Sequence, residues 1–515
     1  MSKYRSDVLF FLVKSLSRSE KRYFRLAETG AESRLYLRLF DLIDTQNEFN
    51  EFALFKAEPE FAQNQFSNLK AHLYSKILKS LRDFSRKRVP GIEIRELIDE
   101  AQILLNKSLY QQCSKRLDKA WKRATETDNL ELQLEILKWK KQVLTYTVDR
   151  ENDTYVDEIV EKVREVNGRI NNSNSFSNLQ AKLQSLYRKS GYIRNEQDFQ
   201  RIQNIFRESM PEIDEHGLSI GEKIHLYHLY IGYHFFIQDF EKGYDYARKW
   251  VKIFRENKAL AGPKIENYIT GLNLLLIAQN KLGLYRPFLE TKKELRQLND
   301  MPSNFFNEHI RLKMLKYTYV HEFNSLFMTG DFDRGVVLFE RLSSKVEGFI
   351  DQMDAHSRII LYYKTASLYF GNGDFKTCLS WLNRIFVSGE SDLREDIHGF
   401  ARILALITHY ELGNTDLIPY ALRSTYRFLL KRDDLQLFQK MQLRFLRSLQ
   451  PDMTDEQLTV RLAALRSQML ELLKNPFEKR AFVYFDFVSW LDSRIEQKPM
   501  MEIVKRKAYA LLQIA

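Results

Sequence analysis

Cysteine is almost absent from this chain. Cys113 and Cys378 are the only two among 515 residues, which excludes a disulfide framework and a cysteine-rich metal site. Each stands where two neighbouring helices would need a small side chain between them, and a thiol packs there much as alanine would. We predict a packing role for both, and so few cysteines suit a reducing compartment.

Proline and glycine are scarce too, with 10 and 19 residues. Folds built from strands need many turns, and turns use these two residue types. The abundant residues are Leu, Glu, Lys, Arg, Gln and Ala, which favour helix. With 44% apolar and 29% charged residues, the composition is that of a globular protein. The sequence therefore predicts an all-α fold, long enough for several domains.

Long apolar runs are also missing. Near the N-terminus the run from Val8 to Val13 ends at Lys14, which is too short for a secretory segment. No run approaches the roughly 20 residues that span a bilayer. We expect a soluble, cytoplasmic protein without a membrane partner.

Several common catalytic signatures are absent from the sequence, which has no phosphate loop, dinucleotide-binding glycine pattern or HExxH. His225 and His228 lie three residues apart on one expected helical face, with His234 further along. A metal would need a third or fourth ligand within reach, and the sequence offers none. We therefore expect no catalytic residues, no metal and no cofactor, and we predict that the chain is not an enzyme.

Basic charge is unevenly spread. The net charge is +11, and residues 1–90 hold 17 Lys and Arg against 11 Asp and Glu, so more than half of the excess lies in this segment. A basic balance favours anionic partners such as nucleic acid or an acidic protein.

A recurring turn organises the chain. In each occurrence an aromatic residue opens the second helix of a helix pair. Clear examples stand at Tyr110, Phe240, Tyr285, Phe332 and Phe375, fainter ones at Tyr155 and Phe199, and a degenerate one has Thr415 in place of the aromatic. Their mean spacing is about 44 residues, and a period of this length indicates stacked units rather than one closed core.

Each unit has a physical logic. The first helix ends at a residue suited to the left-handed conformation, and Asp readily caps the second helix. The aromatic packs back against the first helix. A small residue follows three positions later, at Cys113, Gly243, Gly335 and Cys378, and lets the two helices approach closely.

The segment ASLYFGNGDFKTCLSWL resembles a tetratricopeptide repeat. Ala366 and Tyr369 match the first helix, and Gly373, Phe375 and Cys378 match the turn and the second helix. The likeness covers about residues 92–430. It implies a right-handed α-α superhelix with a concave face that holds peptides or helices.

Several features depart from that family. Its period is about 34 residues, so these helices should be longer, and the usual repeat-ending proline is missing from the clear units. Tyr146, Phe323 and Leu406 are bulky where a small residue is expected. A HEAT-like or another helical-hairpin solenoid is an alternative.

Three domains are predicted. Residues 1–90 form a basic helical head with a capping box at Ser17–Glu20. Residues 91–430 form the tetratricopeptide-like hairpin repeats, and residues 431–515 form helices that cap the C-terminal end, because the ends of a solenoid need atypical caps.

The concave face is the first candidate site. The resemblance places on it side chains of the first helix in each unit, and these suit a protein or peptide partner because Asn can bond both backbone groups and Lys can meet a carboxylate. The candidate groove residues are Tyr187, Arg194, Asn195, His225, His228, Asn273, Asn280, Lys281, Tyr317, Asn324 and Tyr363.

The second candidate is a basic helix expected over residues 69–88, before the helix-breaking VPG. Its cations could neutralise phosphates, and a helical head could enter a major groove. A solvated face on a helix that caps the array is one alternative, and contact with an acidic protein partner is another. The candidate nucleic-acid contacts are Lys70, Lys76, Lys79, Arg82, Arg86, Lys87 and Arg88.

Two functions follow from these sites. The first is a non-enzymatic scaffold or adaptor that binds a protein or peptide on its concave face. The alternative is a regulator with a nucleic-acid-binding head and a ligand-sensing repeat body, similar in plan to bacterial peptide-responsive regulators.

Overall fold

The fold is helical throughout the described part of the chain. The computed structural model describes residues 3–28, 33–61, 63–86, 88–147, 153–302, 305–350, 353–389, 392–432, 434–449 and 453–512, and it has no strand in these ranges. This confirms the all-α prediction. Within the same ranges, no helix combines the length and the hydrophobicity needed to cross a membrane.

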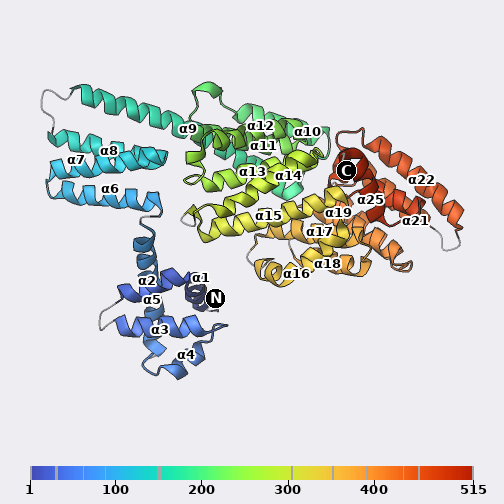
Figure 1. Ribbon diagram of the computed structural model, residues 1–515, viewed down its shortest axis with the longest axis horizontal. Helices are drawn as coiled ribbons and strands as arrows, with labels where there is room; N and C mark the ends of the chain where they lie inside the picture. Colours follow the sequence, from blue (N-terminus) through green and yellow to red (C-terminus); the bar gives the residue numbers. More distant parts are fainter. Residues whose placement is uncertain are drawn as a thin grey trace. The chain divides into compact units, whose positions relative to one another are not determined.

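Two compact units divide the chain, Met1–Gly168 and Arg169–Ala515. The helices before the division are α1 Lys3–Ser15, α2 Arg18–Ala27, α3 Ser33–Thr45, α4 Glu51–Ala57, α5 Gln63–Ser85, α6 Pro90–Asn106, α7 Tyr110–Glu126 and α8 Leu130–Thr147. Helix α9, Asp153–Ser190, contains the division itself. Figure 1 shows α6, α7 and α8 stacked side by side.

Helices of the second unit follow one another in the same paired manner (Figure 1). They are α10 Glu196–Ser209, α11 Ile220–Phe236, α12 Phe240–Glu256, α13 Ile265–Lys281, α14 Tyr285–Gln297, α15 Glu308–Thr329, α16 Phe332–Ile350, α17 Ala355–Gly371, α18 Phe375–Val387, α19 Glu395–Glu411, α20 Ile418–Lys431, α21 Leu437–Ser448, α22 Asp455–Leu472, α23 Ala481–Tyr484, α24 Phe487–Ile495 and α25 Met500–Leu512. Short 3-10 turns lie at Glu215–Gly217, Lys258–Leu260, Leu298–Asp300 and Glu478–Arg480.

The head has a hydrophobic core of its own, which runs from Leu9 to Ile77 through α1–α5. The predicted capping box is present at the start of α2, where the backbone N–H of Glu20 donates to the Ser17 hydroxyl and the backbone N–H of Ser17 donates to the Glu20 carboxylate. A separate core joins α6, α7 and α8. The predicted boundary at residue 90 thus lies between two cores within the first unit.

The recurring turn occurs where the sequence predicts it. Tyr110, Phe240, Tyr285, Phe332 and Phe375 are the first residues of α7, α12, α14, α16 and α18. Two residues before each aromatic, the backbone is left-handed, with φ of 57° at Ser108, 61° at Gln238, 66° at Gly283, 75° at Gly330 and 84° at Gly373. The left-handed backbone is therefore a constant feature of this turn. It is kept at Ser108 and Gln238 as well, although this conformation favours glycine.

Small side chains then admit the neighbouring helix, as predicted. Cys113 and Cys378 are fully buried. A Cβ atom added to Gly243 would lie 2.5 Å from the ring of Phe235, and one added to Gly335 would lie 2.6 Å from Leu368. Close helix contact at the turn therefore depends on these small residues.

The two fainter turns have a different outcome. Tyr155 lies in the first turn of α9 and Phe199 in the first turn of α10, so both are near helix starts. Between them, however, α9 runs for 38 residues without the expected break. It contains no proline, and its Gly168 stays helical. The repeat predicts one helix that begins at Tyr155 and a second helix that ends before Phe199. The structure joins these two in α9, because this stretch has no residue that stops a helix.

Consecutive packing organises the second unit. Each helix from α11 to α22 contacts the next, and α13, α15, α17 and α19 also contact one another in succession, which forms a layer. The C-terminal helices do not simply continue this order, because α25 packs on α15 and α23 packs on α19. One hydrophobic core accordingly runs across the predicted boundary at residue 430, from Phe323 to Val504.

Distant parts of the second unit also meet. The backbone N–H of Arg394 donates to the carbonyl of Arg188 at 2.9 Å. The guanidinium of Arg194 donates to the carbonyl of Arg432 at 3.1 Å. The end of α9 and the start of α10 therefore contact segments more than 200 residues further along the chain. We call Tyr187, Arg394, Asp396 and Tyr484 the closure cluster.

Candidate functional site

Tyr187, a predicted groove residue at the end of α9, belongs to the closure cluster. The guanidinium of Arg394 lies 5.1 Å from the centroid of its ring. Arg394 in turn pairs with Asp396 at 2.8 Å, and both of these side chains are buried. The hydroxyl of Tyr484, at the end of α23, also donates to Asp396. Tyr187 thus packs against its own chain.

Charge in this cluster is balanced internally. Burial alone would raise the pKa of Asp396, but the Arg394 guanidinium outweighs it and holds that pKa below its usual range. A second buried pair, Arg480 with Asp434, lies nearby in the same unit. The hydrogen bond from Tyr484 to Asp396 joins α23 to α19, and the Arg480–Asp434 pair joins the turn before α23 to the segment between α20 and α21. Separating either ion pair would leave a buried charge unpaired.

Arg194 and Asn195 make local contacts. Asn195 caps α10, and its side-chain oxygen accepts the backbone N–H of Asp198 at 2.8 Å. The Nε of Arg194 pairs with the same aspartate at 3.0 Å. Asn195 therefore caps α10, whereas Arg194 both pairs with the first turn of α10 and bonds Arg432 far along the array.

Asn273 and Asn324 belong to a buried polar chain across three helices. Asn273 on α13 bonds His321 on α15 at 2.9 Å, and His321 contacts Asn324 at 3.3 Å. Lys364 on α17 then donates to Asn324 at 2.6 Å. Burial lowers the pKa of His321 to about 3, so its ring is neutral at pH 7. The structure thus brings two predicted residues together through His321 and Lys364.

Lys281 ends α13 in a cationic setting. Its Nζ donates to the carbonyl of Val483 on α23 at 3.3 Å. Burial, followed by the charges of Lys364 and Arg394, lowers the pKa of Lys281 to about 7. Lys281 and Asn280 also line a cavity of about 930 Å³ that Val483 borders. The predicted peptide-binding lysine therefore already holds a backbone carbonyl of its own chain.

The remaining groove residues are scattered. His225 is exposed, while His228 packs against Trp250 with a ring separation of 5.4 Å, and burial lowers the pKa of His228 to about 4. Burial also raises the pKa of Tyr317 to about 12. Tyr363 is buried. In the described part of the chain, no group of three His, Cys, Asp or Glu residues could hold a metal ion.

The predicted groove residues therefore do not line one open surface. Many of the predicted groove residues lie on the layer formed by α13, α15, α17 and α19. The C-terminal helices α25 and α23 pack on α15 and α19 of this layer. Five of the predicted side chains, those of Arg194, Asn195, Asn273, Lys281 and Asn324, bond to other groups of the same chain.

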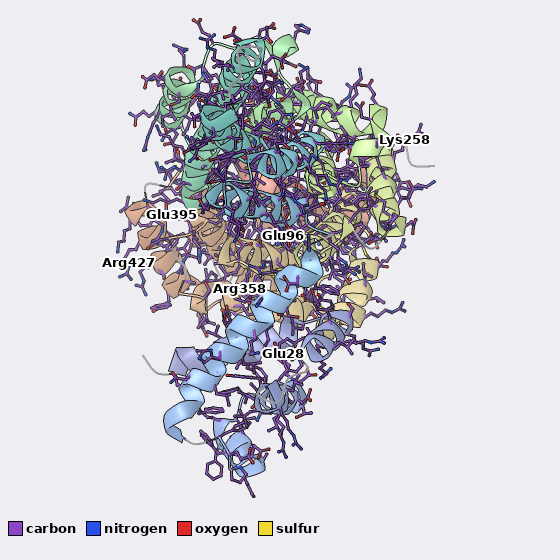
Figure 2. The ribbon with its side chains drawn as sticks, turned by 90° about the vertical axis from the view of Figure 1, so that its left-hand side faces the viewer. Glu28, Glu96, Lys258, Arg358, Glu395 and Arg427 are labelled. Carbon is purple, nitrogen blue, oxygen red and sulfur yellow. The ribbon has the colours of Figure 1, made fainter. Side chains whose placement is uncertain are left out.

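Most of the candidate phosphate contacts in the head are paired. Lys70 lies 3.2 Å from Glu51, and Lys76 lies 2.7 Å from Glu28, which is labelled in Figure 2. Lys79 is exposed and has no acidic partner in the described ranges.

The last part of the expected basic helix is not helical. Helix α5 ends at Ser85, and the backbone of Val89 is extended because Pro90, which opens α6, disfavours a helical residue before it. The remaining contacts are Arg82, 3.7 Å from Asp83; Arg86, 2.5 Å from Glu96; Arg88, 4.4 Å from the ring centroid of Phe84; and Lys87, which lies outside the described residues.

A different surface carries unpaired charge. Helices α20 and α21 together contain six basic and no acidic residues. With the adjoining ends of α19, α22 and α24, they border a groove of about 1460 Å³, which we call the basic groove. Its exposed cations are Arg423 and Arg427 on α20, and Lys440, Arg444 and Arg447 on α21.

None of these five cations has an acidic partner within salt-bridge distance among the described residues. Among the described residues, Arg427, which is labelled in Figure 2, donates only to the carbonyl of Arg423 at 3.4 Å. A sixth cation, Arg494, is paired with Glu411 at 3.3 Å. Asp416 is the acidic residue on the lining. The groove therefore carries a net positive charge that the described residues do not neutralise.

Sequence reasoning missed this groove, although a signal was present. Arg423 and Arg427 are four residues apart, and Lys440, Arg444 and Arg447 repeat at four and three, so each set lies on one helical face. The basic site was predicted in the head because more than half of the excess positive charge lies in residues 1–90.

No family model and no curated protein matches this chain.

Proposed function

We propose that the chain is a non-enzymatic scaffold or adaptor that binds a protein or peptide partner through its array of helix pairs. The observation that carries the proposal is the basic groove, with five exposed cations and no acidic partner for them among the described residues. Unpaired cations around a large groove attract an anionic partner and speed its association.

The proposal moves the binding surface away from most of the predicted concave residues. Lys281, Asn273 and Asn324 bond within the chain, so a partner would first have to displace those contacts. His225 is the exposed member of the predicted set, and the others are buried or half-buried. The groove cations need no such displacement.

The array itself fits a degenerate, long-helix variant of the tetratricopeptide architecture, wound as a right-handed superhelix. The turn geometry and the successive contacts of α13, α15, α17 and α19 support this proposal. We also propose a cytoplasmic location, because the chain has only two cysteines and no long apolar run.

Affinity purification from native cells, with and without nuclease, tests the adaptor function. The wild-type chain is compared with a groove variant, Arg423→Glu with Arg427→Glu, and with a control variant, Lys119→Glu with Lys122→Glu. The control residues are also exposed, lie on α7 and have no acidic partner among the described residues.

We expect a protein partner that survives nuclease, is retained by the control variant and is lost from the groove variant. Recovery of the same partner by the groove variant would contradict the proposal. So would turnover of a substrate by purified protein that recovers no partner at physiological salt.

A second candidate is a regulator with a nucleic-acid-binding head. It is favoured by Lys79, Arg82 and Arg88, which are exposed near the C-terminal end of α5. Filter binding of the full chain to DNA and RNA at rising salt tests this candidate, because phosphate contacts are strongest at low ionic strength. Absence of binding at about 50 mM salt would exclude it.

A further inference from the structure

The basic groove combines charge with an apolar floor. Leu443 and Leu446 on α21 are buried, and they lie between the exposed cations of that helix. Leu422 and Ile418 on α20 add to the same lining. A ligand in this groove would therefore meet aliphatic side chains beneath it and guanidinium groups at its rim.

The spacing of the cations matches a helix. Lys440, Arg444 and Arg447 rise by about 10 Å along α21, given about 1.5 Å per residue. A second helix laid alongside would present carboxylates three and four residues apart at the same interval. Arginine suits such contacts because its planar guanidinium can bond a carboxylate through two N–H groups.

The fold also favours a helical over an extended ligand. An extended peptide that binds by strand addition needs a sheet edge, and the described part of this chain has no strand to offer. A helix has already paired its backbone N–H and C=O groups, so it can enter an apolar groove without leaving them unsatisfied.

Single-stranded nucleic acid fits the groove less well. Bases bind by stacking on aromatic side chains, but the floor is mainly aliphatic, and the aromatic lining residues are Tyr410 and Tyr426. Asp416 on the lining would also repel a phosphate backbone. The apolar floor and the cationic rim together select an amphipathic protein segment.

We propose that the basic groove holds an acidic amphipathic α-helix of a partner protein, of about three turns. Its apolar face lies on Leu422, Leu435 and Leu449, which are partly exposed leucines of the lining, and its Asp and Glu side chains pair with Arg423, Arg427 and Arg444. This inference rests on the proposed adaptor function and names the chemistry of the partner.

Fluorescence anisotropy with the full chain tests the inference. The probe is a fluorescein-labelled helical peptide of about 18 residues, with Leu at positions i, i+3, i+4 and i+7 and Glu on both flanks. A scrambled peptide of identical composition removes the apolar face but keeps the charge. A single-stranded RNA of matched charge represents the other class of ligand.

We expect the amphipathic peptide to bind, and the scrambled peptide to bind at least tenfold more weakly. Arg423→Glu with Arg427→Glu should weaken binding about tenfold or more, whereas Lys119→Glu with Lys122→Glu should change it less than twofold. Affinity should also fall as salt rises from about 50 to 300 mM, since the rim contacts are exposed. Far-UV circular dichroism and thermal melting of each variant establish that the helices remain folded.

Three results would overturn the inference: equal binding of the scrambled peptide, tighter binding of the RNA with loss in the groove variant, or no binding of the peptide. These results are separable from failure of the adaptor function. If the groove variant loses its cellular protein partner but the peptide does not displace that partner from the wild type, the adaptor function stands and the helical ligand is wrong.

Discussion

Lys281 should make the stability of the protein depend on pH near neutrality. Its ammonium lies among buried groups at the end of α13, and burial together with Lys364 and Arg394 lowers its pKa to about 7 from 10.5. Between these two values the folded state binds fewer protons than the unfolded state does. The free energy of unfolding therefore rises with pH across this window. Below pH 7 both states are protonated, and the folded state carries the full cost of the buried charge.

The expected size follows from the linkage relation. One proton contributes about 1.4 kcal/mol per pH unit where the two states differ fully. From pH 7 to pH 9, Lys281 should therefore add about 2 kcal/mol to the free energy of unfolding. The substitution Lys281→Met removes this contribution. It also removes the hydrogen bond to Val483, which costs about 1 kcal/mol at every pH and leaves the slope unchanged.

Urea unfolding at pH 6, 7, 8 and 9 measures the difference, with tryptophan fluorescence as the signal because Trp250 and Trp490 are buried in the same unit. We expect the variant to be more stable relative to wild type at pH 6 than at pH 9. The control is Lys376→Met, an exposed lysine on α18, whose curve should parallel the wild type. Parallel curves for Lys281→Met and wild type would refute the reasoning, since the ammonium would then be solvated in the folded state.

Three further experiments, two with substitutions and one with a thiol reagent, test the packing of the second unit. Gly335→Ala places a Cβ 2.6 Å from Leu368, so thermal melting should show a loss of about 1–3 kcal/mol, and an unchanged melting temperature would contradict the close helix contact. Arg394→Ala leaves Asp396 buried and unpaired and should cost about 3–5 kcal/mol in urea unfolding, with much of the loss restored when Asp396→Asn is added. Burial raises the pKa of Cys378 to about 12, so its thiol should resist iodoacetamide in the native protein and react only after denaturation. Rapid native labelling would show that this thiol is accessible.

The local signals in the sequence predicted much of the fold. An aromatic two residues after a left-handed residue, followed by a small side chain, marks the same turn at Phe332 and Phe375. These features act over a few residues, so they are readable without tertiary structure. The unbroken α9 was missed because the period suggested a turn that its helix-forming residues do not make.

Contacts between distant segments were beyond the sequence. Nothing in the spacing of Arg188 and Arg394 shows that their backbones would bond, or that Lys281 would reach Val483. The predicted groove was taken from an open array, whereas the C-terminal helices pack on its inner layer. Arg444 likewise has no acidic partner among the described residues, and this depends on tertiary contacts that the sequence does not show.

The return of α23 to α19 has a consequence for synthesis on the ribosome. Asp396 emerges 88 residues before Tyr484, the group that completes its bonding. At about 5–20 residues per second, synthesis of these residues takes on the order of ten seconds. During that time Asp396 lacks Tyr484 and is exposed to solvent. The array cannot mature hairpin by hairpin as it leaves the exit tunnel, and a stop codon shortly before residue 480 would leave a polypeptide that displays its unfinished inside to chaperones and proteases.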